Sequence, residues 1–486
     1  MSGRSLRYLA GALTLLTATV ATAQPFEVPP PPAPPRPLAI AAPVEQVLPN
    51  GLRVIVARRE GVPLVTAMLV VLSGSELDPP QLSGLASMTA SLLTQGTRKR
   101  SGPEIAAAAE ALGGSLESGA GWGQSLVAIT VTTPRLDAAL GLVAEVTREP
   151  TFAPAELERI RNQTLDALKV SYADPGTVAG LTAARLAYGS GAWGHPADGT
   201  PASLPRIKRA DLVALHRLAF RPDRAVLILS GDIGPEQGDL LAGRHFGNWA
   251  APVGVAPPRP PTPPTLTDGP AVAVVDMPAA GQAGVVLALP LPPRVGAERA
   301  AADVLDAVLG GGYSSRLSQE VRIKRGLSYA VHSRIEARGR NGLFLAALQT
   351  KNESAVEVVA LLKAELDRVM QAPVPADELA SRKLSLIGGF SRSVETTAGL
   401  ASAIRSLVAT ERAPGELKTR IAAIEAVESA DVQRYAAAHF GATGRRLAVA
   451  GAAQRFAESL KAEAPGLVVI GQPQLDLERA DGLRRD

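Results

Sequence analysis

The same sequence pattern occurs twice in this chain, 220 residues apart. The helical stretches Ala210–Phe220 and Ala430–Phe440 both open with Ala-Asp. An apolar strand follows each one, Arg224–Gly231 and Arg445–Gly451, and the final glycines are again 220 positions apart. Two further pairs of segments match less closely and occur in the same order. They are Pro154–Leu157 with Pro375–Leu379, and Ala179–Leu181 with Ala398–Leu400. Several pairs in one order indicate a duplicated domain.

Length supports this division, because 486 residues are too many for a single core. Two proline-rich stretches, which favour extended polyproline conformations, separate the parts. The expected organisation is a signal peptide at 1–23, a Pro-rich segment at 24–42, a first domain at 43–250, a Pro-rich linker at 251–270, a second domain at 271–475 and a tail at 476–486.

The N-terminus has the pattern of a secretory signal. Arg4 and Arg7 precede the apolar run Tyr8–Val20, and the small residues Ala21–Ala23 come before Gln24. We therefore expect cleavage and a periplasmic location, with no membrane span afterwards. An uncleaved membrane anchor is the alternative, although the apolar run is short for a span. The chain has no cysteine, so no disulfide supports the fold.

Composition is that of an ordinary soluble globular protein, with 46% apolar and 20% charged residues. The net charge is +4, and no run of like charge occurs. Aromatic residues make up 3%, and no Lys/Arg stripe is interleaved with them. A nucleic-acid partner is therefore not expected.

Strand patterns precede helix patterns in the first half. Asn50-Gly51 is a hairpin turn signal, and Ser101–Glu104 is a capping box with proline in the first turn. The expected elements are strands Leu52–Ala57 and Leu64–Leu72, a helix from Ser101 that ends at Gly113-Gly114, and helices Pro154–Tyr172 and Val178–Tyr188. This order predicts an α+β fold with helices on a mainly antiparallel sheet.

The segment Gly84–Thr97 reads GLASMTASLLTQGT. By its residues alone it is an amphipathic helix whose small side chains pack closely against a neighbour. It also resembles the zinc-binding helix of the pitrilysin/insulinase-type metallopeptidases, the inverzincins, which runs Gly-Leu-Ala-His-x-x-Glu-His before Gly-Thr. The resemblance covers nearly all of residues 43–475, and it implies two related α+β halves that form a clam shell around a central cleft.

The groups that bind zinc in that family are missing here. Ser87 and Ser91 stand where the resemblance places the two histidines, and Ala90 stands where it places the glutamate base. Ala167, 76 residues after Ser91, stands at the position of the third ligand, a glutamate. Zinc requires imidazole, thiolate or carboxylate ligands. We therefore expect no metal and no catalytic residue in this chain alone.

A second family motif is intact. Leu309–Leu317 reads LGGGYSSRL and leads into Arg322 and Tyr329, which resembles the signature of the family's C-terminal half. In relatives the corresponding arginine and tyrosine face the zinc and hold the substrate peptide. Both side chains can donate hydrogen bonds to a peptide carbonyl or to an oxyanion. The expected substrate-binding residues are Gly310, Gly311, Gly312, Arg322 and Tyr329.

Without the resemblance, these residues have plainer interpretations. Arg322 would be a solvated charge on a helix, and Tyr329 would be a core or interface residue with its hydroxyl satisfied. The three glycines would form a simple turn. The joint match over the whole motif favours the substrate-binding role.

The sequence contains little that supports a catalytic site of another kind. No two of the five histidines (His195, His216, His245, His332 and His439) lie within one helical turn, so a local zinc motif is excluded, although a site built from distant residues is not. His195 lies in a stretch that matches a structural loop of the family. No Gly-x-Ser-x-Gly motif indicates a serine hydrolase.

The resemblance implies a peptidase-family protein that is inactive alone. Our first hypothesis is a zinc-free subunit of a heterodimeric metallopeptidase, with zinc supplied by a pitrilysin-type partner and an unfolded or extended peptide as substrate. The alternative is a structural or peptide-binding pseudo-peptidase, like the peptidase-derived core subunits of respiratory assemblies. A third hypothesis, an independently active hydrolase with an unrecognised site, has no ligands or base to support it.

Overall fold

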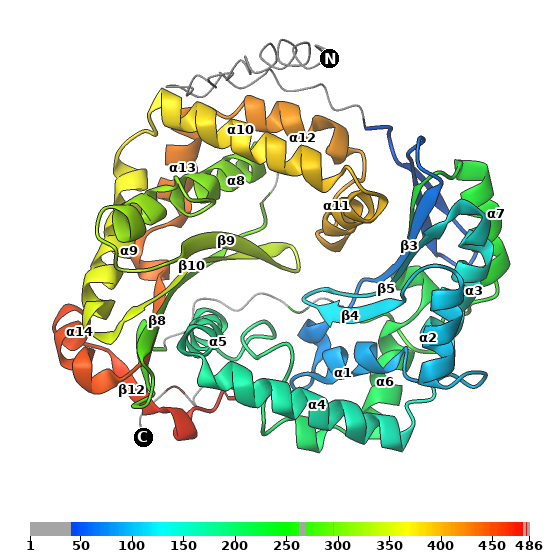
Figure 1. The fold of residues 1–486 in the computed structure, drawn as a ribbon, viewed down its shortest axis with the longest axis horizontal. Coiled ribbons are helices and arrows are strands. Elements are labelled where there is room, and N and C mark those ends of the chain that lie inside the picture. The colour runs from blue at the N-terminus through cyan, green and yellow to red at the C-terminus, as the bar shows by residue number, and fades with distance from the viewer. Residues whose placement is uncertain (1–39, 260, 262–268, 295, 480–482, 484–486) are drawn as a thin grey trace, which may run out of the picture. The chain divides into compact units, whose positions relative to one another are not determined.

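The computed structural model describes residues 40–259, 261, 269–294, 296–479 and 483. The expected signal peptide lies outside these residues, as do most of the Pro-rich segment 24–42 and the middle of the linker 251–270. The described chain forms an N-terminal half and a C-terminal half, and each has a six-stranded sheet with helices against it (Figure 1). The predicted α+β class is confirmed. No helix in the described ranges is long and apolar enough to cross a membrane.

The sheet of the N-terminal half has the order β1-β2-β6-β3-β5-β4. Only the pair β2–β6 is parallel, so the sheet is mainly antiparallel, as predicted. The strands are β1 (Val44–Val47), β2 (Arg53–Arg58), β3 (Leu64–Val71), β4 (Glu117–Gly121), β5 (Gln124–Thr132) and β6 (Ala225–Gly231). The helices are α1 (Leu85–Leu92), α2 (Gly102–Ala111), α3 (Leu136–Arg148), α4 (Pro154–Ala173), α5 (Pro175–Tyr188), α6 (Arg209–Ala219) and α7 (Pro235–Phe246).

Local sequence signals explain several of these boundaries. β1 and β2 form the hairpin predicted by Asn50-Gly51, and the Asn50 side chain fixes the turn by donating to the Phe246 and Trp249 carbonyls at 2.8 and 3.0 Å. Helix α2 begins at the predicted capping box of Ser101 and Glu104. These bonds satisfy donors that would otherwise be orphaned at a turn and at a helix start.

The sheet of the C-terminal half has the order β12-β7-β11-β8-β10-β9, with β7 parallel to β11 and β12. Its strands are β7 (Val272–Asp276), β8 (Gln282–Leu291), β9 (Val331–Arg338), β10 (Asn341–Lys351), β11 (Arg446–Gly451) and β12 (Val468–Gly471). The helices are α8 (Ala297–Leu309), α9 (Ala355–Gln371), α10 (Ala376–Ser393), α11 (Thr397–Ala409), α12 (Glu416–Glu425), α13 (Ser429–His439) and α14 (Ala457–Glu463). The β11 strand and helix α13 repeat β6 and α6, as the 220-residue offset predicts.

The two halves exchange helices. Helix α5 packs on the sheet of the C-terminal half, while helix α11 packs on the sheet of the N-terminal half (Figure 1). At the second contact, Thr66 of β3 and Thr397 at the start of α11 share a hydrogen bond of 2.8 Å between their hydroxyl oxygens. The halves are therefore held together by buried contacts of both sheets.

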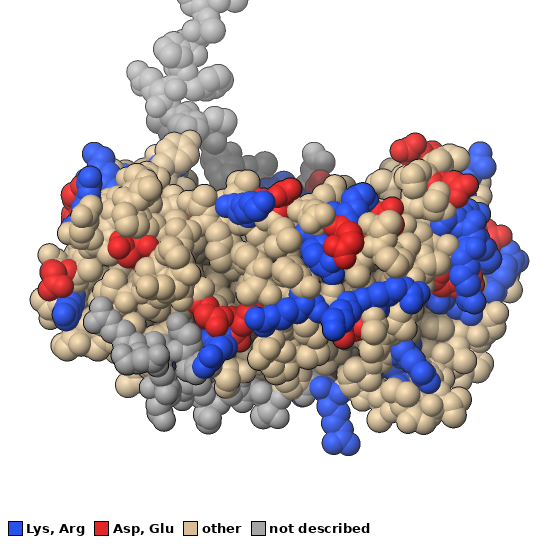
Figure 2. Space-filling model, turned by 90° about the horizontal axis from the view of Figure 1, so that it is seen from below, with Lys and Arg blue, Asp and Glu red and all other residues tan. Residues whose placement is uncertain are grey.

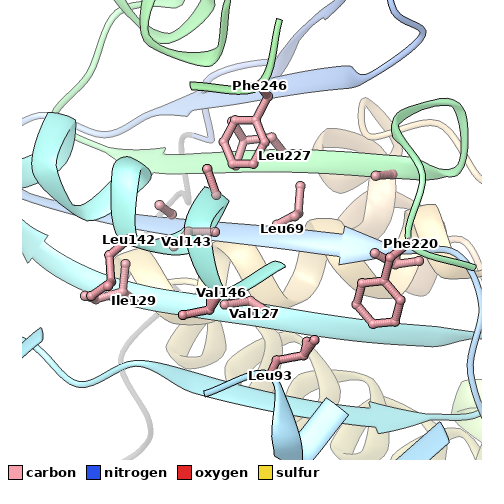
Figure 3. Close-up of a cluster of buried hydrophobic side chains, with 14 of the residues drawn as sticks. Leu69, Leu93, Val127, Ile129, Leu142, Val143, Val146, Phe220, Leu227 and Phe246 are labelled. Carbon is pink, nitrogen blue, oxygen red and sulfur yellow. The ribbon is translucent and has the colours of Figure 1, made fainter. Parts of the chain in front are cut away.

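Each sheet is apolar on both faces. In β8, Val285 and Leu287 belong to the core beneath α8 and α9, while the alternating Val286 and Ala288 belong to the core beneath α5. The N-terminal half has its main core between the sheet and helices α3 and α7, where Leu69 and Phe246 are buried (Figure 3). Truncation of such a buried phenylalanine to alanine typically costs about 3–5 kcal/mol.

Charge is dispersed over the face of the molecule that Figure 2 shows. Figure 2 shows a short row of Lys and Arg side chains on one face, with Asp and Glu side chains among them. Most of that face is neither acidic nor basic. Such a surface gives no strong field of one sign to attract a polyanion.

Candidate functional site

Helix α1, which carries the replaced zinc positions, begins at a strained turn. Gly84 has φ of +88°, and an added Cβ would lie 2.8 Å from the Gly199 backbone, so only glycine fits. The Asp78 carboxylate accepts hydrogen bonds from the Gly84 and Ala86 backbone N–H groups, both at 2.8 Å. Burial raises the pKa of Asp78, and the nearby His195 imidazole opposes that rise.

The four replaced positions have different surroundings. The Ser87 hydroxyl donates to Asp198 Oδ1 at 3.1 Å, and Ser91 is half-buried on the same helix. Ala90 is fully buried. Ala167 is exposed on α4, which packs directly beside α1. Serine hydroxyls and methyl groups therefore occupy this region, and none of these four residues provides an imidazole or a carboxylate.

A cavity of about 1060 Å³ is lined by both halves, and its lining includes Asp198, which accepts the hydrogen bond from Ser87 of α1. Asp198 and His195 contribute from the N-terminal half, and the edge strand β9 with the residues before it contributes from the C-terminal half. Tyr329 is part of this lining. The cavity is large enough for several residues of an extended peptide, since typical ligand sites measure about 300–1,000 Å³.

Aromatic and charged groups connect the two walls of the cavity. The centroids of the Trp122 and His195 rings are 5.2 Å apart. Arg338 Cζ lies 4.7 Å from the centroid of the Trp122 ring. His195 Nε2 is 3.5 Å from Asp78 Oδ2, so His195 also supports the start of α1. Nothing in the sequence indicates this contact, because Trp122 lies in the turn between β4 and β5 and Arg338 lies at the end of β9, far away in the chain.

Arg322 and Tyr329, two of the expected substrate-binding residues, lie in contact. Arg322 lies on the π-helical turn η5 (Ser318–Ile323), and its Cζ is 4.7 Å from the Tyr329 ring centroid. Turns of this kind are frequent at functional sites. Tyr313 contacts the same guanidinium at 4.9 Å. Sequence reasoning missed Tyr313 as a site residue, although it lies inside the glycine-rich motif.

The tyrosines that flank Arg322 are unusually exposed. Tyr329 is 85% exposed and Tyr313 is 63% exposed. Neither hydroxyl has a hydrogen-bond partner among the described residues, so both are available to a ligand. A core or interface interpretation of Tyr329 within this chain is therefore not supported.

The three glycines differ in their packing. A Cβ on Gly310 would lie 2.1 Å from the Ser333 backbone nitrogen, and one on Gly311 would lie 2.6 Å from Ala307 Cα. Gly312 has nothing within 4 Å of such an atom and is exposed. Gly310 and Gly311 thus let the loop pack against β9 and α8, and Gly312 is the glycine whose backbone faces open space.

Asp306 anchors the same loop. Its backbone carbonyl accepts from the Gly310 and Gly311 N–H groups at 2.9 and 3.1 Å, and its carboxylate accepts from the Ser333 hydroxyl at 2.6 Å. Burial raises the pKa of Asp306 to about 6, against the lowering effect of the Ser333 hydrogen bond. The loop that carries Tyr313 is therefore fastened to the backbone of Asp306, while the carboxyl group of Asp306 binds Ser333 of β9.

Comparisons with known proteins identify the family of this chain. A family model described as Insulinase (Peptidase family M16) matches residues 53–185, and one described as Peptidase M16 inactive domain matches residues 206–386. A Mycobacterium tuberculosis protein named an uncharacterized zinc protease is 30% identical over 368 residues, which cover 75% of this chain and 83% of that protein. The chain belongs to the insulinase family of peptidases, family M16.

Other members of the insulinase family are similar over much of the chain. A Helicobacter pylori protein named non-peptidase homolog YmxG is 27% identical over 316 residues, 65% of this chain and 72% of its own. The crystal structure of a peptidase M16 inactive domain from Pseudomonas fluorescens has a TM-score of 0.78 at 25% identity, and it covers 84% of this chain and 98% of its own. The relatives thus carry names of both active and inactive proteins.

The zinc of the insulinase family does not fit the residues of this chain. The positions that the resemblance assigns to its ligands and base are Ser87, Ala90, Ser91 and Ala167, which offer no suitable donor. Within the described ranges, no group of three or more His, Cys, Asp or Glu side chains is placed to hold a metal ion. We therefore derive no step of chemistry through a metal bound to this chain.

Proposed function

We propose that this chain is the zinc-free subunit of a heterodimeric metallopeptidase. It would bind the substrate and stabilise the transition state, while a zinc-bearing family member would supply the metal and the base. The single observation that supports this most strongly is the contact of Arg322 with the exposed Tyr329, which lines the cavity.

The geometry suits binding of an extended peptide. Strand β9 is an edge strand of its sheet and lines the cavity, so its free backbone groups can pair with a peptide by β-augmentation. Tyr329 lies two residues before this strand, and its hydroxyl can donate to a peptide carbonyl. The guanidinium of Arg322 adds a positive charge close to the Tyr329 ring, which favours an oxyanion in the transition state.

A second candidate is a peptide-binding or structural pseudo-peptidase with no role in proteolysis. The relative named a non-peptidase homolog supports it, as does the replacement of the zinc positions by neutral side chains. A purely structural role, however, gives no reason for two exposed tyrosines on either side of an arginine. The two candidates differ in whether Arg322 and Tyr329 affect cleavage.

The test is reconstitution with a zinc-bearing partner. This chain, the partner and the mixture are each assayed for bound zinc and for cleavage of an unfolded peptide. We expect zinc in the partner only, and cleavage at least about tenfold faster in the mixture. Loss of this stimulation in Tyr329→Phe and Arg322→Gln would support the subunit role. Cleavage that is equal with and without this chain would overturn it and favour the pseudo-peptidase.

The proposed location is the periplasm, based on the pattern of residues 1–23. N-terminal sequencing of the exported protein should give Gln24 as the first residue. Recovery of the protein with its original N-terminus in the membrane fraction would contradict this proposal and support the anchor.

A further inference from the structure

A second cavity, of about 540 Å³, lies in the C-terminal half among helices α8, α10, α11 and α12 (Figure 1). It shares no lining residue with the cavity that both halves line. Its apolar lining includes Phe390, Leu407, Leu417 and Ile424, and its charged lining comprises Arg299, Asp303, Arg412, Glu416 and Arg420. An apolar chamber with few charged groups is the common form of a small-molecule site.

The charges in this cavity are not balanced. Asp303 is the only carboxylate within 4 Å of three arginines in the described structure. Its oxygens lie 3.3 Å from Arg294, 3.2 Å from Arg420 and 3.8 Å from Arg299. The Arg299 distance is too long for a hydrogen bond. Three guanidinium groups thus surround one carboxylate, and most of their N–H donors have no acceptor among the described residues.

Arg412, in the segment between α11 and α12, adds a further donor. Two of its nitrogens bind the Glu416 carboxylate, but its Nη1 is buried with no hydrogen-bond partner in the described structure. Burial also lowers the pKa of Arg299 to about 10, because the charged form is poorly solvated there. Desolvated guanidinium groups without full pairing are costly, and an anion in the cavity would remove that cost.

We propose that this cavity binds a small organic anion, a carboxylate attached to an apolar group. The carboxylate accepts hydrogen bonds from Arg412 and Arg420, whose planar guanidinium groups match its geometry. The apolar group contacts Phe390 and Leu407 on the cavity wall. The inference is independent of the proposed role in proteolysis, because none of these residues belongs to the Arg322–Tyr329 site.

The first part of the test compares ligands and needs no mutation. Calorimetric titration of the full chain compares N-acetyl-leucine with its uncharged amide and with inorganic phosphate at equal ionic strength. We expect the acid to bind about tenfold more tightly than either control, because it alone has both a carboxylate and an apolar group. Equal binding of acid and amide, tighter binding of phosphate, or no binding of the acid would overturn the proposal.

The second part of the test uses charge-neutral variants. Arg420→Gln and Arg412→Gln should each weaken binding of the acid about tenfold, while Arg434→Gln, a substitution of an exposed side chain on α13, should leave it unchanged. Asp303→Asn should tighten binding, because it removes the carboxylate that competes for the arginines. Weaker binding in a folded Asp303→Asn variant, as judged by an unchanged far-UV spectrum, would show that the network is only structural and would overturn the proposal.

Discussion

The guanidinium of Arg322 lies between two exposed tyrosine rings, 4.7 Å from the Tyr329 centroid and 4.9 Å from the Tyr313 centroid. Exposed cation–π contacts are individually weak, about 0.5–1 kcal/mol each. They nevertheless restrict a long side chain to one region, and this lowers the entropy lost when a ligand binds. These contacts therefore favour preorganisation of Arg322 and Tyr329 for the proposed binding of peptide.

Substitution of Arg322 should weaken peptide binding with little effect on stability. We expect Arg322→Gln to lower the affinity of this chain for a labelled extended peptide about tenfold, because a charge-assisted hydrogen bond is lost. The matched control is Arg58→Gln, an exposed arginine paired with exposed Glu60 on the other sheet. Fluorescence anisotropy measures both. Equal affinities in the two variants would rule out the binding role of Arg322.

The glycine-rich loop allows a prediction with an internal control. Gly310→Ala should destabilise the protein by about 2–4 kcal/mol, because its Cβ would overlap the Ser333 backbone. Gly312→Ala should change the free energy of unfolding by no more than about 0.5 kcal/mol, since its Cβ meets nothing. Urea denaturation compares the two. Similar costs at both positions would contradict this account of the loop.

Local structure could be predicted well from the sequence. The strand predicted at Leu64–Leu72 is β3, and the helix predicted at Pro154–Tyr172 is α4 with a difference of one residue at its end. The helix predicted at Val178 instead begins at Pro175, because Asp174 caps it and proline fits the first turn. Caps and apolar periodicity are short-range signals, so a single sequence contains them.

Long-range packing could not be predicted in the same way. The periodicity of α5 shows that one face is buried, but not that this face packs on the sheet of the other half. For the same reason, a motif in the sequence identified Arg322 and Tyr329 as a pair, but nothing in the sequence indicated that Trp122, His195 and Arg338 form a cluster. Their contacts depend on how turns from the two halves meet, and no local spacing encodes that.

Protonation of Asp306 should stabilise the protein. Its pKa in the folded chain is about 6, above the ordinary value of 3.8, so the folded state binds the proton more tightly. The stabilising contribution is complete below pH 3.8 and is lost as pH rises through about 6. Asp306→Asn should therefore be more stable than the parent at pH 7, by up to about 3 kcal/mol.

The measurement for Asp306 is the midpoint of urea unfolding between pH 5 and pH 8. The difference between the parent and Asp306→Asn isolates this one group from the other carboxyls whose pKa is raised by burial, such as Glu76 and Glu365. The difference should grow with pH across about pH 6. A difference that is constant over this range would show that Asp306 does not titrate there.

Restoring ligands to helix α1 should create a zinc site, if the replaced positions face the same side as in zinc-dependent relatives. Ser87→His and Ser91→His are one helical turn apart and so lie on one face, and Ala167→Glu adds a carboxylate from neighbouring α4. Asp198, 3.1 Å from the Ser87 hydroxyl, can accept the second N–H of a histidine at that position and orient it.

The triple variant should retain about one zinc per chain after gel filtration, measured by mass spectrometry of the metal. The same variant with Ala167→Gln should bind zinc at least about tenfold more weakly, because an amide is a poor zinc ligand. Equal zinc content in the two variants would show that α4 does not face the histidines, and that this helix pair differs in arrangement from a zinc site.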